Sequence, residues 1–134
     1  MTGTTLLGYQ YVVLRCVPRV EREEFVNVGV VLYSQAADFL AGRYVVDDDR
    51  LRALAPDLDA DEVRAALEAV CRVCRGETGG GLPHLDGLGR RFGWISAPRS
   101  TVVQPGPVHG GLTSDPGEEL EGLLRRMVGG PRPD

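Results

Sequence analysis

Lysine is missing from this chain of 134 residues: all 15 basic side chains are arginine, and asparagine occurs once, at Asn27. Chemistry that needs a lysine, such as a Schiff base or a P-loop, is therefore excluded. Codon bias in a GC-rich genome explains such a composition. Selection of guanidinium groups for anion recognition would instead require the arginines to cluster in one site.

Cysteine is scarce, and its odd number, with Cys16, Cys71 and Cys74, does not indicate a disulfide framework. The first residues lack the basic segment and apolar stretch of a signal peptide, and no apolar run approaches membrane-spanning length. We therefore expect a cytoplasmic protein without a membrane partner. The net charge of −4 argues against nucleic acid as the main partner.

The remaining composition is that of a globular protein, with 43% apolar and 25% charged residues. A chain of this length forms one domain by the usual size of domains. We expect that domain to span residues 1–130. Residues 131–134, with two prolines in PRPD, are expected to form a frayed tail.

Three segments rich in β-branched and aromatic residues predict strands joined as an antiparallel meander: 9–17, 25–34 and 39–46. The second is apolar on both faces, so it should be central and covered on both sides. Simple alternation places Val26, Val28, Val30 and Leu32 on one face. Asn27 and Gly29 interrupt this strand, and we expect a β-bulge in which the amide of Asn27 is hydrogen-bonded.

Helices are predicted where acidic caps precede apolar residues at helical spacing. Asp59, with Glu62 three residues later, predicts the start of the main one, and Asp115-Pro116 predicts another near the C-terminus. Shorter helices are expected over 47–56 and 85–92. A strand is expected in 101–104 and a loop over 105–114, because the latter holds two prolines and three glycines. The fold class is α+β: one antiparallel sheet packed against about three helices.

Residues 87–114 contain three arginines and no carboxylate, although the whole chain is acidic. The segment holds Arg99, Ser100, Thr101, Gln104 and His109, and a helix is expected to start directly after it. Guanidinium groups, hydroxyls and a helix N-terminus are suited to binding an anion or an acidic peptide. Alternatively, Arg99 pairs with a carboxylate elsewhere, Asp115 fills the helix N-terminus, and the segment only crosses the surface.

Two further patterns are compatible with catalysis but do not require it. Cys71 and Cys74 have CxxC spacing, yet they lie near a helix end, where the helix dipole does not lower a thiol pKa. We expect them to pack in the core, with redox chemistry and a zinc site as alternatives. His109 could transfer a proton with Ser100 or Ser114 as nucleophile, but the GxSxG pattern is absent. No metal or cofactor is expected.

Two stretches, YVVLRCVPRVEREEFVNVGVVLY (11–33) and RFGWISAPRSTVVQPGPVHGGLTSDPGEELEGLL (91–124), resemble the bacterial family called domain of unknown function 3037. The resemblance implies no established activity. It implies small stand-alone proteins whose genes often lie beside those of HipA-like kinases, and hence a partner or accessory role. The residues that match its signature are Arg15, Phe25, Asn27, Gly29, Trp94, Arg99, Ser100, Thr101, Gln104, His109, Asp115 and Pro116.

Two functional hypotheses follow. The first is a non-enzymatic module that binds a protein partner, such as a HipA-like kinase, through Arg99, Ser100, Thr101, Gln104 and His109 and through Arg15 and Asn27 on the adjacent sheet. The second is a small phosphate- or nucleotide-binding protein or enzyme, in which Arg99 holds the anion and His109 transfers a proton. Clustering of these residues in one pocket would favour the second. An open sheet edge would also permit pairing with a second copy of the chain.

Overall fold

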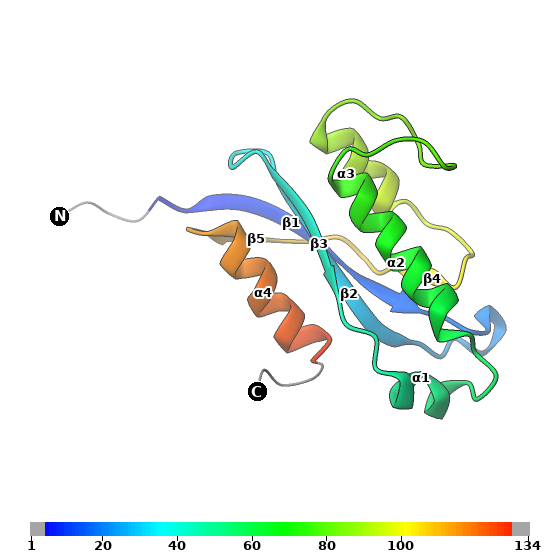
Figure 1. The fold of residues 1–134 in the computed structure, drawn as a ribbon. Helices are drawn as coiled ribbons and strands as arrows, with labels where there is room; N and C mark the ends of the chain where they lie inside the picture. The colour runs from blue at the N-terminus through cyan, green and yellow to red at the C-terminus, as the bar shows by residue number, and fades with distance from the viewer. Residues whose placement is uncertain (1–4, 130–134) are drawn as a thin grey trace.

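The structure, a computed structural model, describes residues 5–129, so the expected tail at 131–134 lies outside the described residues. The elements are β1 (Leu7–Cys16), η1 (Val20–Arg22), β2 (Val26–Ser34), β3 (Phe39–Tyr44), α1 (Asp48–Leu54), α2 (Ala60–Cys74), α3 (Leu88–Ser96), β4 (Val103–Pro105), β5 (His109–Thr113) and α4 (Pro116–Met127). The fold is α+β, as predicted, with four α-helices in the described residues instead of about three (Figure 1).

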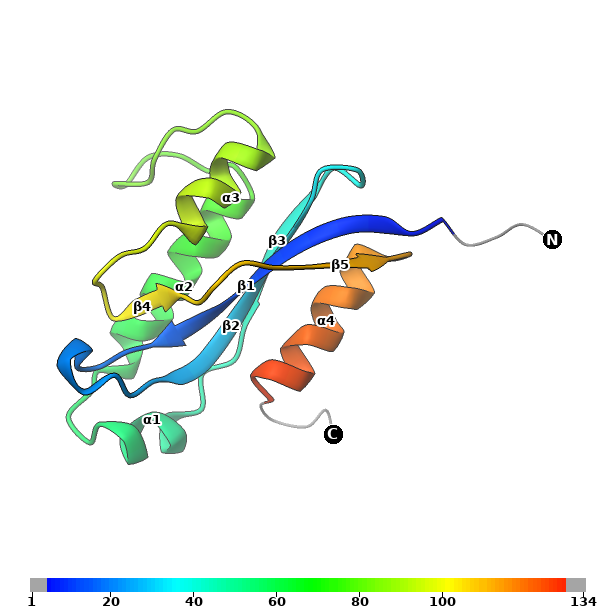
Figure 2. The same cartoon turned by 180° about the vertical axis from the view of Figure 1, so that it is seen from behind.

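The sheet is antiparallel throughout, with strand order β3-β2-β1-β4, and β5 pairs with β1 as well. The meander predicted from the first three strands is therefore correct. β4 pairs with the end of β1 at Leu14–Cys16, and β5 with its beginning at Leu7–Tyr11. The two short strands thus follow one another along the same edge of β1 (Figure 2).

The expected loop over 105–114 is wrong in its second half, where His109–Thr113 forms β5. Gly110 and Gly111 belong to the run of prolines and glycines that predicts a loop over 105–114. In the sheet, however, Gly111 provides room for a neighbouring side chain: a Cβ there would lie 2.6 Å from the hydroxyl oxygen of Tyr9. These glycines therefore serve close packing within a strand.

The expected bulge lies in β2, where Leu14 pairs with Gly29 and the next residue, Arg15, pairs with Asn27. Val28 is the additional residue, and it reverses the alternation of faces along the strand. The assignment of Val26, Val28, Val30 and Leu32 to a single face is therefore wrong. Val26 and Val28 pack on the side of α2, whereas Val30 and Leu32 pack on the side of α4.

Helices cover both faces of the sheet, as expected for a central β2 (Figures 1 and 2). On one side, α1, α2 and α3 form the larger core through Leu51, Leu67, Phe92 and their neighbours. On the other side, α4 contributes Leu120, Leu123 and Leu124 against β2 and β3. The β1, β4 and β5 half of that second face is less covered, and this asymmetry positions the candidate site.

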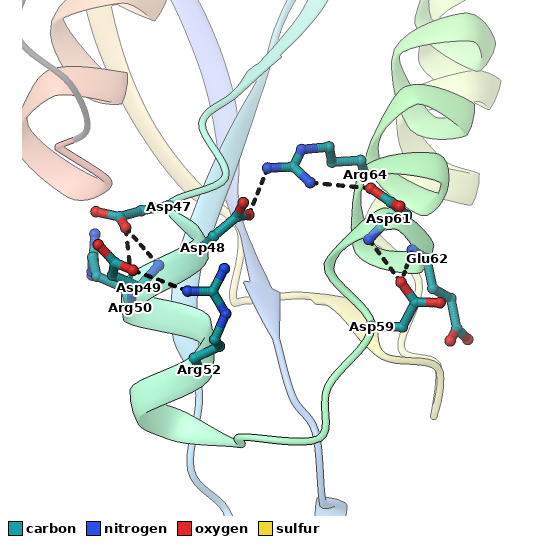
Figure 3. A network of polar contacts seen from close by, with 9 residues as sticks. All are labelled: Asp47, Asp48, Asp49, Arg50, Arg52, Asp59, Asp61, Glu62 and Arg64. Atoms are coloured by element: carbon teal, nitrogen blue, oxygen red, sulfur yellow. Dashed lines mark hydrogen bonds and ion pairs between the residues drawn. The ribbon is translucent and has the colours of Figure 1, made fainter.

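The predicted acidic caps begin three helices. The Asp47, Asp59 and Asp115 side chains each accept hydrogen bonds from backbone N–H groups of the following turn. Arg64 of α2 joins two helices by pairing with Asp48 of α1, at 2.6 Å, and with Asp61 of its own helix (Figure 3). Within residues 5–129, no helix is long and apolar enough to cross a membrane.

Candidate functional site

Three of the sequence candidates form one polar row across the sheet. Arg15 on β1 pairs with Asn27 on β2 in one direction and with Gln104 on β4 in the other. The side chains of Val12, Leu14 and Cys16 on β1 enter the core on the α2 side. Alternation along the strand therefore directs Arg15 to the opposite side, the side of α4. Residues separated by up to 89 positions are brought together in this way.

The guanidinium of Arg15 is held between an aromatic ring and the backbone. Its Cζ atom lies 4.2 Å from the centroid of the Phe25 ring, within range of a cation–π interaction. On the β4 side, a Cβ at position 106 would lie 3.2 Å from both the Cζ and Nε atoms of Arg15, so a larger residue there would require the arginine side chain to shift. The buried Nε atom has no hydrogen-bond partner among the described residues. A cavity of about 300 Å³ lies beside the Arg15 side chain and is lined by Arg15, Val17, Val20, Glu23, Phe25 and Gln104.

Asn27 connects the bulge to the last turn of α4. Its Nδ2 atom donates a 3.0 Å hydrogen bond to the carbonyl oxygen of Met127. The buried Oδ1 atom has no hydrogen-bond partner within residues 5–129. The expectation of a hydrogen-bonded amide therefore holds for Nδ2 and not for Oδ1. This bond satisfies one of the carbonyl groups that a helix C-terminus leaves free.

Arg99 lies apart from this row and is engaged by its own segment. Its Cζ atom is 4.4 Å from the centroid of the Trp94 ring, and its guanidinium donates hydrogen bonds to the carbonyl oxygens of Trp94 and Ala97. Burial lowers the pKa of the Arg99 guanidinium.

The other candidates of this segment lie in the turn before β4. Ser100 is exposed, and the hydroxyl of Thr101 donates a hydrogen bond to the carbonyl oxygen of Val103. Gln104 donates to the carbonyl oxygen of Thr101, so these side chains mainly stabilise the turn before β4.

His109 begins β5 and lies against an aromatic pair that the sequence hypotheses did not include. It is opposite Tyr11 in the sheet, with 5.3 Å between ring centroids, and Tyr11 is 6.1 Å from the ring of Tyr9. Burial and the neighbouring carboxylate of Glu119 raise the pKa of Tyr9. The two tyrosines, two positions apart on one strand, could have been recognised as sharing a face by alternation alone.

We call the following set the open face: Tyr9, Tyr11, Arg15, Phe25 and His109. All are planar groups, and the tyrosines and Arg15 lie on the α4 side of the sheet. α4 packs mainly on β2 and β3, so Tyr9 and Tyr11 touch its core cluster only in part and, like Arg15, remain partly exposed. His109 is exposed, and Phe25 is 44% exposed. Two acidic side chains lie next to members of this set: Glu23, at the Arg15 cavity, and Glu119, beside Tyr9.

The cysteines are buried, as core packing predicts. Burial raises the pKa of Cys16 to about 11 and, with a smaller effect of Cys71, that of Cys74 to about 12. The thiol of Cys71 donates to the carbonyl oxygen of Gly42 at 3.5 Å. Such thiols are poor nucleophiles at neutral pH. Across the described part of the chain, no three His, Cys, Asp or Glu side chains gather as metal ligands would.

The fold and this surface define a small α+β domain with one sheet face partly uncovered. The family model described as "Protein of unknown function (DUF3037)" matches residues 11–128, and the chain belongs to that family. The resemblance noted from the sequence is thereby confirmed. No curated protein and no solved structure matches the chain.

Proposed function

We propose that this chain is a non-enzymatic binding module of the cytoplasm and that a protein partner docks on the open face. The observation that carries the proposal is that two groups of planar side chains, Tyr9–Tyr11–His109 and Arg15–Phe25, lie along β1 and its neighbours, on the half of the sheet that α4 covers least. Tyrosine and arginine are enriched among the residues that dominate protein–protein binding energies. Rigid rings also lose little conformational freedom when a partner immobilises them.

The arrangement gives less support to a phosphate- or nucleotide-binding site made by Arg99 and His109. Arg99 stacks on Trp94 of α3, whereas His109 lies against Tyr11 of β1. The cavity that includes Gln104 is lined by neither of these two residues. In an enzyme of this kind, the arginine that binds the anion and the histidine that acts as general base must both reach the same substrate.

A HipA-like kinase is the first partner to test, because the family resemblance suggests it. Affinity capture of the tagged protein from its own host should recover one protein in stoichiometric amount. In the variant Tyr11→Ala/His109→Ala, we expect at least a tenfold loss of that protein. His84→Ala is the matched control, since His84 is also exposed but lies in the loop before α3.

Equal recovery of the partner by both variants would show that the open face is not the docking surface. The variants need circular dichroism to establish that they fold. If no partner is recovered and light scattering gives twice the mass of one chain, with loss of the dimer in Tyr11→Ala/His109→Ala, self-association replaces the proposed partner.

A further inference from the structure

We infer that Arg15 is the residue of the open face that binds a carboxylate, and that the partner supplies it as an aspartate or glutamate side chain of a peptide segment. This inference rests on the proposed function, because it names the chemistry of the partner at the same surface. It is carried by the unmatched guanidinium of Arg15, the way this group is held and the cavity beside it.

The guanidinium of Arg15 forms no ion pair and no hydrogen bond within residues 5–129. Seven other arginines of the described chain form ion pairs: Arg22, Arg43, Arg52, Arg64, Arg72, Arg75 and Arg126. Arg50, Arg91 and Arg99 donate to backbone carbonyl oxygens. Of the four arginines left without either kind of contact there, Arg19, Arg90 and Arg125 are exposed and only Arg15 is partly buried. A partly buried cation without a partner costs free energy, which an incoming carboxylate would recover.

The guanidinium of Arg15 is also held ready for a ligand. Its Cζ atom lies 4.2 Å from the centroid of the Phe25 ring, and Gly106 is close enough on the β4 side that an added Cβ would lie 3.2 Å from its Nε and Cζ atoms. A side chain that is already immobilised loses little further conformational entropy on binding. Arginine and carboxylate are matched in shape, since a planar fork of N–H groups meets two oxygens.

The surroundings of Arg15 favour a single negative charge over a phosphate. Its cross-strand neighbours, Asn27 and Gln104, are neutral amides, so no second cation flanks it in the row. Glu23 lines the same cavity and would repel a doubly charged group. Val17, Val20 and Phe25 give the cavity apolar walls, which suit the aliphatic stem of an aspartate or glutamate.

The test uses a phage-displayed library of random peptides selected on the immobilised full chain. We expect the selected peptides to carry an acidic residue at a fixed position. A labelled synthetic copy should bind Arg15→Gln at least tenfold more weakly in fluorescence anisotropy. Arg15→Lys should bind with intermediate strength because it keeps the charge and loses the fork. Arg19→Gln is the control at an exposed arginine that forms no side-chain hydrogen bond or ion pair within residues 5–129, and its binding should stay within twofold.

Replacing the acidic residue of the peptide by its amide should weaken binding as much as Arg15→Gln does. Combining the two changes should add little, because they remove the same contact. The peptide change also tests the inference on the unaltered protein, should Arg15→Gln fail to fold.

The two proposals fail in distinguishable ways. Peptides that depend on Tyr11 and His109 but bind Arg15→Gln with unchanged affinity would overturn the carboxylate contact and leave the proposed function intact. Peptides that bind Tyr11→Ala/His109→Ala as well as the wild type would count against the open face itself. Displacement of the peptide by inorganic phosphate, with no effect of acetate at equal ionic strength, would replace the carboxylate by a phosphate.

Discussion

At the scale of single residues, the glycine at position 111 is required by a side chain that lies across it. The added Cβ of Gly111→Ala would lie 2.6 Å from the hydroxyl oxygen and 2.8 Å from the Cζ atom of Tyr9. The ring must therefore move, and because it is partly exposed the cost should lie at the lower end of the range of about 1–3 kcal/mol for overpacking. We expect that loss in the free energy of unfolding, measured with urea.

Gly110→Ala is the control for this substitution. A Cβ at position 110 would approach only the carbonyl oxygen of Tyr9, at 3.4 Å. The same strand thus gains a methyl group without a clash, and the loss should be clearly smaller than at position 111. Combining Gly111→Ala with Tyr9→Ala should remove the clash. Equal effects of the two alanines would show that general strand propensity is responsible, and not the ring.

A second prediction at this scale concerns the buried thiols and the change of the free energy of unfolding with pH in alkaline solution. Burial raises the pKa of Cys16 to about 11 and that of Cys74 to about 12, whereas an unfolded thiol titrates near about 8.5. Above that lower pKa the unfolded chain releases protons that the folded chain retains. The free energy of unfolding should therefore fall as the pH rises from about 9 to about 11.

The double variant Cys16→Ala/Cys74→Ala isolates the thiol contribution, because tyrosines also titrate in this range. We expect the free energy of unfolding of this variant to depend less steeply on pH than that of the wild type. Parallel pH profiles, measured by urea titration at each pH, would exclude the thiols as the cause.

At the scale of elements, the start of α2 depends on one carboxylate. Asp59 accepts hydrogen bonds from the N–H groups of Asp61, at 3.0 Å, and Glu62, at 3.4 Å. Asp59→Ala leaves both donors to water, and loss of such a cap costs about 1 kcal/mol. Asp57→Ala removes an exposed acid two residues earlier and should change stability by less than about 0.5 kcal/mol. The melting temperatures of the two variants are compared by thermal unfolding followed by circular dichroism. Equal shifts would show that the loss of a negative charge, and not the loss of the cap, is responsible.

Elements with local signals could be predicted from the sequence, and those that depend on distant residues could not. The cap at Asp59 and the proline after Asp115 act within one turn, and both helices start where these residues predict. β5 is different, because the signal for this strand is its pairing with the distant β1, where Gly111 leaves room for the ring of Tyr9. The reversal of faces at Val28 depends on pairing with β1 in the same way.

At the scale of the molecule, the same limit applies to the candidate site. Arg15, Asn27 and Gln104 could be named from the sequence, but their contact needs the strand order β2-β1-β4. The tyrosines of β1 were not named, because alternation shows which residues share a face and not which face a helix leaves open. That information comes from the position of α4 over β2 and β3.

The two cores should unfold together, because β2 belongs to both. Val28 and Val31 pack on the α2 side of this strand, whereas Val30 and Leu32 pack on the α4 side with Leu123. Leu123→Ala should therefore destabilise the whole domain by about 2–5 kcal/mol, although it changes only the α4 side. The single tryptophan, Trp94, is exposed and lies on α3, the helix whose Phe92 and Ile95 belong to the other core. Its fluorescence midpoint in urea should shift together with the midpoint of the far-UV circular dichroism signal, as expected for a cooperative chain shorter than about 150 residues.

Leu112→Ala, at a side chain that is 64% exposed, is the control and should shift neither midpoint. A fluorescence midpoint that stays in place while the far-UV signal moves would mean that α4 detaches independently, and the open face would then extend over β2 and β3.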